Sequence, residues 1–200
     1  MTPVAPRSLV LATRNGHKLA ELREILAGVE VRPLEESVEL PPEDGETFAE
    51  NALGKARAAA RATGSPAIAD DSGITAAALG GRPGVRSARY AGEDASDEQN
   101  LELLIAELEP HVDRSVAYVC AMAYVDPVGV ELVCEAECAG TLAREPRGDG
   151  GFGYDPGFLP DDTAAGDSRT MAELSPSEKH AISHRGRAAR RLASRLGVPG

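Results

Sequence analysis

The sequence has no tryptophan, four tyrosines, three phenylalanines and only three cysteines among 200 residues. Three cysteines cannot build the dense disulfide framework of a small secreted domain, so Cys120, Cys134 and Cys138 are expected to be reduced, buried thiols. No apolar run approaches the ~20 residues that a helix needs to cross a bilayer, which argues against a membrane protein. No apolar leader follows Met1, so we expect a cytoplasmic protein.

Basic residues are also scarce, because 21 lysines and arginines stand against 32 acidic residues and the formal net charge is −11. A nonspecific nucleic-acid binder normally carries a broad basic face, so this charge argues against that class. Residues 179–200 are the exception, with six lysines or arginines and no acid. Most of this charge is expected on a solvated helix face, although a local basic focus can also hold a polyanionic small ligand.

The rest of the composition, 42% hydrophobic and 26% charged, is that of a globular protein large enough to bury a sizeable core. Strands alternate with helices early in the chain and two strands joined by a turn follow, which predicts an α/β protein with a mixed sheet. Residues 1–200 are expected to form one domain. The expected strands cover residues 8–12, 67–71, 116–125 and 130–138. The first expected helix follows residue 18, has an apolar stripe from Leu19 to Leu26 and stops at Gly28. The other expected helices cover residues 47–63, 96–108 and 175–196.

Two adjacent aspartates, Asp70 and Asp71, follow a short apolar strand and precede Ser72 and Gly73. Neighbouring carboxylates repel each other unless a cation or a proton lies between them, so the pair is a candidate metal site. Asp, Ser and Gly are also ordinary turn residues. We therefore expect the strand to end here with a turn at Gly73, as either a metal site or a surface turn.

A second candidate is the polar loop at residues 13–18, between the first strand and the first helix. Free backbone N–H groups and the helix dipole favour an anion in such a loop, which would suit a phosphate. The loop lacks the Walker A spacing, and a capped helix start with a solvated Lys18 explains it equally well. Lys55, one helical turn after Asn51, is by itself more typical of a solvated lysine.

The glycine-rich segment 148–157 contains two of the few aromatic residues, Phe152 and Tyr154. Aromatic rings on a flexible backbone favour stacking on a nucleobase, and a structural turn is the alternative. His180 and His184 have a metal-compatible spacing, but no Glu completes a zinc motif, so zinc is rejected. Near this helix, Lys179, Ser183, His184 and Arg185 are better explained as hydrogen-bond donors, although His184 alone is more typical of a structural histidine.

Five stretches taken together resemble the Ham1-like family, the inosine-triphosphate-pyrophosphatase-like enzymes that act on noncanonical purine nucleotides. The stretches are residues 11–18, 46–52, 69–73, 152–156 and 183–186, in the family's order and spacing. The resemblance implies a two-lobed mixed-sheet fold with a central nucleotide-binding cleft. It also implies a homodimer that uses Mg²⁺ to hydrolyse XTP, ITP and dITP to the monophosphate and pyrophosphate.

By position, the resemblance also assigns roles to individual residues. Asp71 would bind Mg²⁺ and act as the general base, and Glu43 would be a second metal-associated acid. In the mechanism that we expect from these assignments, the positive charges of Lys18, Lys55 and Lys179 would neutralise the departing pyrophosphate. The resemblance assigns nucleotide binding to Thr13, Arg14, Asn15, Gly16, His17, Lys18, Ser72, Phe152, Gly153, Tyr154, Asp155, Lys179, His184 and Arg185.

Three other functions are compatible with parts of this pattern. A Maf-like pyrophosphatase of similar architecture would act on pyrimidine or modified nucleotides instead. A nucleotide sensor would bind without turnover, which the intact acidic pair argues against. A purely structural interaction module would leave the basic and aromatic loops unexplained.

Overall fold

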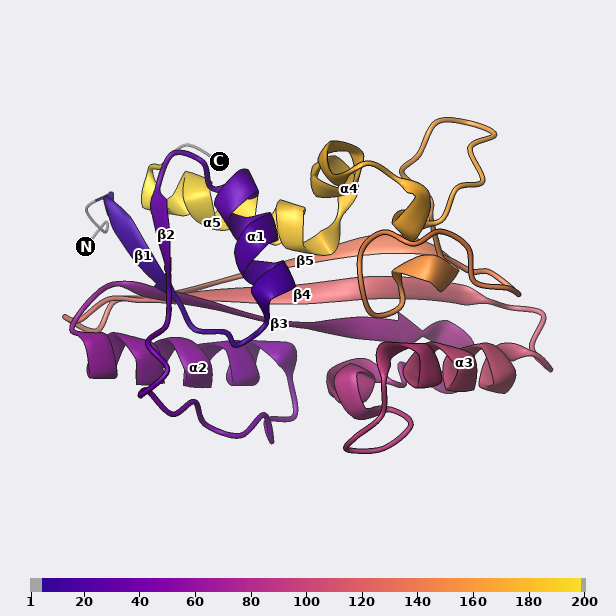
Figure 1. The fold of residues 1–200 in the computed structure, drawn as a ribbon, viewed down its shortest axis with the longest axis horizontal. Coiled ribbons are helices and arrows are strands. Elements are labelled where there is room, and N and C mark those ends of the chain that lie inside the picture. Colours follow the sequence, from indigo (N-terminus) through magenta and orange to yellow (C-terminus); the bar gives the residue numbers. More distant parts are fainter. Residues whose placement is uncertain (1–4, 199–200) are drawn as a thin grey trace. The chain divides into compact units, whose positions relative to one another are not determined.

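The structure is a computed structural model that describes residues 5–198 (Figure 1). Its strands are β1 (Ser8–Leu11), β2 (Glu30–Pro33), β3 (Ala67–Ala76), β4 (Ser115–Val125), β5 (Glu131–Leu142) and β6 (Phe158–Pro160). Its α-helices are α1 (Gly16–Ile25), α2 (Phe48–Thr63), α3 (Asp97–Leu108), α4 (Pro176–Ile182) and α5 (His184–Leu196). Within residues 5–198, no helix has the length and apolar character that crossing a membrane would need.

The six strands form one sheet in the order β2-β1-β3-β4-β5-β6. Strand β1 pairs in parallel with both β2 and β3, whereas β5 pairs antiparallel with β6. The N–H of Gly129 donates to the carbonyl of Asp126 at 3.1 Å, which closes the predicted turn between the neighbouring strands β4 and β5. Parallel and antiparallel pairs in one sheet confirm the prediction of an α/β protein with a mixed sheet.

The chain divides into two compact units. Unit 1 contains the residues up to Asp71, Cys120–Ala136 and the residues from Arg185 onward. Unit 2 contains Ser72–Val119 and Glu137–His184. Strands β3, β4 and β5 each contribute residues to both units, so neighbouring residues of one strand can belong to different cores.

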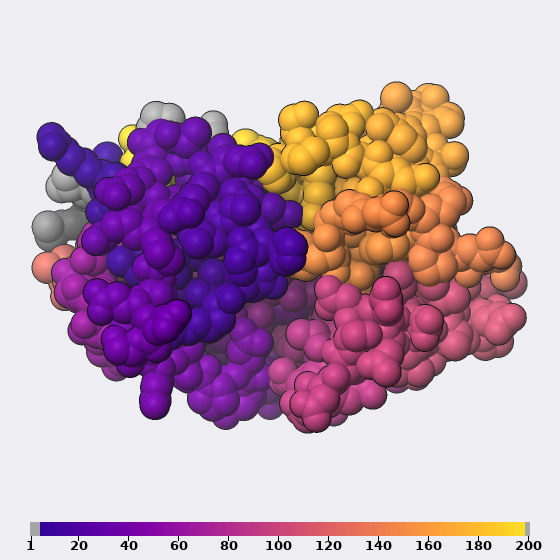
Figure 2. All heavy atoms as spheres, viewed as in Figure 1, coloured from indigo at the N-terminus to yellow at the C-terminus, as the bar shows by residue number. Residues whose placement is uncertain are grey.

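In unit 1, helices cover both faces of the sheet: α2 lies on one face, and α1 and α5 lie on the other (Figure 1). Successive strand residues point to opposite faces. Accordingly, Leu9 and Leu11 of β1 pack with α1 and α5, whereas Val10 packs with the buried alanines of α2. In the space-filling view, the indigo and purple atoms of this unit form one continuous packed surface (Figure 2).

Unit 2 has its own core, built by α3 and the parts of β3, β4 and β5 that belong to this unit. Leu104 and Leu108 of α3 are fully buried, and so is Phe158 of β6. The expectation of buried, reduced cysteines is confirmed, because Cys120, Cys134 and Cys138 are all buried and free.

The predicted helix starts at Thr47, Ser96 and Ser175 are confirmed, because each residue caps its helix in a capping box. The predicted continuous helix over residues 175–196 was wrong. Ser183 has extended backbone angles, φ −64° and ψ 150°, so α4 ends before it and α5 begins at His184. The apolar spacing did not show this break, because one extended residue hardly disturbs a helical pattern.

The predicted turn at Gly73 was also wrong, because β3 continues through Asp70, Asp71 and Ser72 to Ala76. The strand lies between β1 and β4, and the two aspartates are buried inside it. Gly73 has a different role, since a Cβ there would lie 2.3 Å from Ser87 Oγ and 2.6 Å from the carbonyl oxygen of Gly84. Glycine is needed here for close packing and not for a turn.

A Gly73→Ala protein should therefore be less stable by about 2 kcal/mol, because overpacking a tight site costs about 1–3 kcal/mol. The free energy of unfolding in urea measures this loss. Gly54→Ala is the matched control, because its Cβ would meet only Pro41 Cγ at 3.8 Å. This control should gain up to about 1 kcal/mol from better helix propensity. A Gly73→Ala protein as stable as the wild type would contradict the packing argument.

Candidate active site

The two aspartates of β3 belong to unit 1 and face different helices. Because side chains alternate along a strand, Asp70 contacts residues of α1 and α5, whereas Asp71 contacts residues of α2. The pair that the sequence shows as one acidic motif therefore forms two separate polar clusters in the structure.

Asp70 is 1% exposed and is surrounded by cations. Its Oδ2 atom lies 3.0 Å from Lys18 Nζ and 3.0 Å from Arg185 Nε, and Arg185 also pairs with Glu21 Oε2 at 2.7 Å. Burial alone would raise the pKa of Asp70, but the charges of Lys18, Arg185 and Lys55 outweigh burial and hold it far below its ordinary value. Asp70 is therefore a charged anchor between the sheet and two helices.

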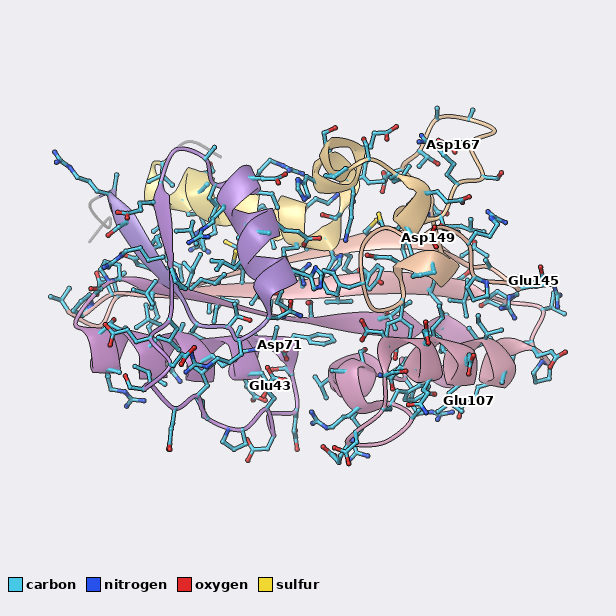
Figure 3. The ribbon with its side chains drawn as sticks, in the orientation of Figure 1. Glu43, Asp71, Glu107, Glu145, Asp149 and Asp167 are labelled. Atoms are coloured by element: carbon cyan, nitrogen blue, oxygen red, sulfur yellow. The ribbon has the colours of Figure 1, made fainter. Side chains whose placement is uncertain are left out.

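Asp71 has a different set of partners, and Figure 3 shows it beside Glu43. Asn51 Nδ2 donates to Asp71 Oδ2 at 2.9 Å. Lys55 Nζ lies 3.5 Å from Asp71 Oδ1 and 2.5 Å from Glu43 Oε1, so the two acids share one ammonium group. Asn51 also accepts the N–H of Gly45 at 2.8 Å, which ties the loop that carries Glu43 to α2.

The electrostatics of this second cluster differ from those around Asp70. Burial raises the pKa of Asp71, the charge of Glu43 adds to the rise, and Lys55 and Asn51 only partly oppose it. For Lys55, burial acts to lower the pKa, but Asp71, Asp70 and Glu43 raise it above its ordinary value. Burial also acts to raise the pKa of Glu43, and Lys55 reverses this and lowers it. Asp71 is thus the carboxylate that accepts a proton more readily.

The donor set around Asp71 suits a hard cation that a substrate helps to bind. Among residues 5–198, no group of three or more His, Cys, Asp or Glu side chains is arranged to hold a metal ion. Mg²⁺ commonly binds only one or two carboxylates and completes its octahedron with phosphate oxygens and water. Asp71 and Glu43, which already share a cation, match that pattern.

The loop at residues 13–18 is a capped helix start. Asn15 is the N-cap of α1, and its Oδ1 accepts the N–H groups of His17 at 2.9 Å and Lys18 at 3.3 Å. Thr13 Oγ1 accepts the N–H of Asn15 at 3.1 Å. The guanidinium of Arg14 donates to the carbonyl of Leu34 at 3.2 Å and to three other carbonyls of residues 35–38. The phosphate-binding role of this loop, including Gly16, stays a prediction.

In unit 2, the carboxylate of Asp155 organises the aromatic segment. Its Oδ2 atom accepts from Lys179 Nζ at 2.8 Å and from the N–H of Phe152 at 2.9 Å, and its Oδ1 accepts from the hydroxyl of Tyr118 at 3.1 Å. Lys179 Nζ lies 4.8 Å from the ring centroid of Phe152. The structure thus brings two predicted site residues, Phe152 and Lys179, to a third, the buried Asp155.

The other predicted residues of this segment are placed differently. Tyr154 is buried in the core of unit 2, and its hydroxyl donates to the carbonyl of Ser87 at 2.8 Å. The N–H of Gly153 donates to Asp97 Oδ2 at 2.7 Å. Of the two aromatic rings, Phe152 is the half-buried one, and it is the better candidate for stacking on a base. The substrate roles of Tyr154 and Gly153 stay predictions.

His184 is 5% exposed, and its ring stacks on that of Tyr118 with centroids 4.5 Å apart and planes at 5°. Arg185 follows it in the chain but is engaged by the carboxylates of Asp70 and Glu21 in unit 1. Ser72 is half-buried on β3, directly after Asp71. The roles of these residues in substrate binding stay predictions.

Sequence reasoning missed the side chains that support the site. Glu21 and Tyr118 lie in a helix and a strand that look like ordinary packing elements, and no motif marks them. In the sequence, Asn51 served only to place Lys55 one helical turn later, yet the amide of Asn51 links Asp71 to the loop that carries Glu43. What distinguishes these side chains is that they are polar and buried, and burial is known only from the structure.

A sequence model of the Ham1 family matches residues 9–195. The dITP/XTP pyrophosphatase of Mycolicibacterium paratuberculosis is 51% identical, and the match covers 94% of this chain and 95% of the relative. The dITP/XTP pyrophosphatase of Geobacter sulfurreducens is 48% identical over 96% of this chain and 98% of the relative. The solved HAM1 protein of Coxiella burnetii superposes with a TM-score of 0.84 at 46% identity, over 95% of this chain and 98% of that one. Sequence and fold together show that the chain belongs to the Ham1 family.

Proposed function

We propose that this protein hydrolyses the noncanonical purine nucleoside triphosphates XTP, ITP and dITP to the monophosphate and pyrophosphate. Such an activity would clear these nucleotides from the cellular pool. One observation carries the proposal above all others: a buried Asp71 shares the ammonium group of Lys55 with Glu43. The support from comparison is that relatives about half identical to this chain are named dITP/XTP pyrophosphatases.

The chemistry of the triphosphate is assigned to unit 1, with Mg²⁺ held by Asp71 and Glu43 as the proposed cofactor. Bound there, Mg²⁺ would neutralise phosphate charge and lower the pKa of a bound water. Asp71, whose pKa burial raises, is suited to orient the attacking water and to accept its proton. Lys18 and Lys55 neutralise the charge on the departing pyrophosphate.

The purine base is assigned to unit 2, where Phe152 supplies an aromatic face and Lys179 and His184 supply hydrogen-bond donors. Hypoxanthine and xanthine carry an oxygen at position 6, whereas adenine carries an amino group there. A donor that pairs with the oxygen is left without a partner when adenine binds, and an unpaired buried donor gives strong discrimination. Donors to the oxygen at position 6 therefore account for the rejection of adenine.

We also propose that the protein works in the cytoplasm as a homodimer. The homodimer is carried by the family resemblance. The cytoplasmic location is supported by three buried, free cysteines, which suit a reducing compartment.

The direct test is incubation with ITP and Mg²⁺, followed by identification of the products. IMP plus pyrophosphate is the expected result, whereas IDP plus orthophosphate would contradict the proposed bond cleavage. ITP, XTP and dITP should exceed ATP in kcat/KM by about 100-fold or more. Chelation of the metal should abolish turnover, and added Mg²⁺ should restore it. Equal rates on ATP would contradict base reading, and preference for a pyrimidine nucleotide would favour the Maf-like alternative.

A further inference from the structure

One buried side chain of unit 2 contacts His184 and also Asp155, the acid that holds Lys179 and Phe152. Tyr118 lies on β4 and is 7% exposed. Its hydroxyl donates to Asp155 Oδ1 at 3.1 Å, and its ring stacks on the imidazole of His184. Its hydroxyl and its ring are thus engaged by Asp155 and His184, so Tyr118 can influence base recognition through these neighbours.

The hydroxyl contact extends through Asp155 to a cation and an aromatic ring. One carboxylate oxygen of Asp155 holds Lys179 Nζ and the N–H of Phe152, and the other accepts from Tyr118. Lys179 Nζ in turn lies over the ring of Phe152 at a cation–π distance. The orientation of the carboxylate therefore sets the place of both Lys179 and Phe152.

The ring of Tyr118 is itself held in place. Phe158, which is fully buried, packs against it with centroids 4.6 Å apart and planes at 41°. His184 lies parallel to it, at 4.5 Å and 5°. Aromatic pairs of this kind have preferred geometries, so the plane of the Tyr118 ring restricts the plane of the imidazole.

We infer that Tyr118 is a positioning residue for base recognition, which orients His184 through its ring and Asp155 through its hydroxyl. The inference rests on the proposed function, because His184, Lys179 and Phe152 matter only if they contact the base. It adds a residue that acts through these neighbours and that no sequence motif marks. The two ends of the side chain act on different partners, so mutation can separate them.

Tyr118→Phe keeps the ring contacts and removes only the hydroxyl. The KM for ITP should rise about three- to tenfold, since a hydrogen bond to a charged carboxylate is lost. The kcat should stay within about twofold, because the chemistry assigned to Asp71 is untouched. The preference for ITP over ATP should fall together with the rise in KM. A purely structural tyrosine would lower thermal stability and leave both KM and base preference unchanged.

Tyr118→Leu removes the ring as well, and kcat/KM for ITP should fall by about 30-fold or more. The ring-proton NMR signals of His184 should also shift, because the ring of Tyr118 no longer lies against the imidazole. This second readout needs no substrate. Tyr124→Phe is the matched control, because it removes a hydroxyl from a residue of the same strand that is 2% exposed and packs in the core of unit 1.

The outcomes separate the inference from the proposed function. If the wild-type protein neither binds nor hydrolyses ITP, the proposed function fails and the inference fails with it. If the wild-type protein is active and Tyr118→Phe has the same KM and base preference as the wild type, the inference alone is overturned. Unchanged His184 signals in a folded Tyr118→Leu protein would overturn the stacking role. If Tyr124→Phe changes KM as much as Tyr118→Phe does, the change reflects general disruption of the core, and the inference is overturned as well.

Discussion

An Asp71→Asn protein is expected to lose at least about 100-fold in kcat on ITP, because the amide can neither accept a proton from water nor bind a cation as a carboxylate does. The geometry of the cluster should survive, since the amide can keep a hydrogen bond to Asn51 and Lys55 keeps Glu43. The loss should therefore appear in turnover far more than in nucleotide binding. Steady-state kinetics together with ITP binding in the absence of metal measure the two separately.

The stability of this variant should change little. Burial disfavours the charged carboxylate of Asp71, which is why its pKa is raised, and a neutral amide avoids that cost. The same substitution removes one carboxylate from Lys55, so the two effects on stability act in opposite directions. We expect the free energy of unfolding to stay within about 1 kcal/mol of the wild type. A folded Asp71→Asn protein with near-normal turnover would remove the central assignment of the proposed function.

An Asp70→Asn protein, which changes the neighbouring aspartate, should instead lose much of its stability. Removing one partner of a buried ion pair costs about 3–5 kcal/mol, because the remaining charge is left buried and poorly compensated. Here Arg185, itself 2% exposed, would lose Asp70 while it keeps Glu21, and Lys18 would lose Asp70 as well. Urea unfolding of the wild type and the variant at neutral pH measures the loss.

The same variant should change how stability depends on pH. The folded-state pKa of Asp70 lies below its unfolded value of about 3.9, so its contribution is complete above about pH 4. That contribution is lost as pH falls toward the lowered pKa. Wild type and Asp70→Asn should therefore approach each other in stability as the solution is acidified below pH ~4.

Glu131→Gln is the matched control for Asp70→Asn. Glu131 forms a two-contact ion pair with Arg57, with both N–O distances at 2.6 Å, but the side chains of Arg57 and Glu131 are 46% and 35% exposed. A solvent-exposed pair contributes at most about 1 kcal/mol, so this variant should lose far less stability. Equal losses in the two variants would show that burial does not set the value of the Asp70 pairs.

Much of the architecture was predictable because it depends on local patterns. The capping residues Thr47, Ser96 and Ser175 satisfy nearby N–H groups through side chains three residues apart, so each helix start is visible in a short stretch of sequence. The alternation of strands and helices likewise predicted the mixed sheet. Where the local pattern was ambiguous the predictions failed, as at Gly73, where turn residues continue a strand.

The sequence by itself determined the helix starts at Thr47, Ser96 and Ser175, the presence of β1, β3, β4 and β5, and the order of the five family-like stretches, because each depends on residues close together in the chain. Only the tertiary structure decided that Asp70 anchors two helices while Asp71 meets Lys55 and Glu43. It also decided that Tyr118 contacts Asp155 and His184. The physical reason is that burial and ion pairing depend on which distant side chains converge on a given face, and this convergence leaves no local pattern in the chain.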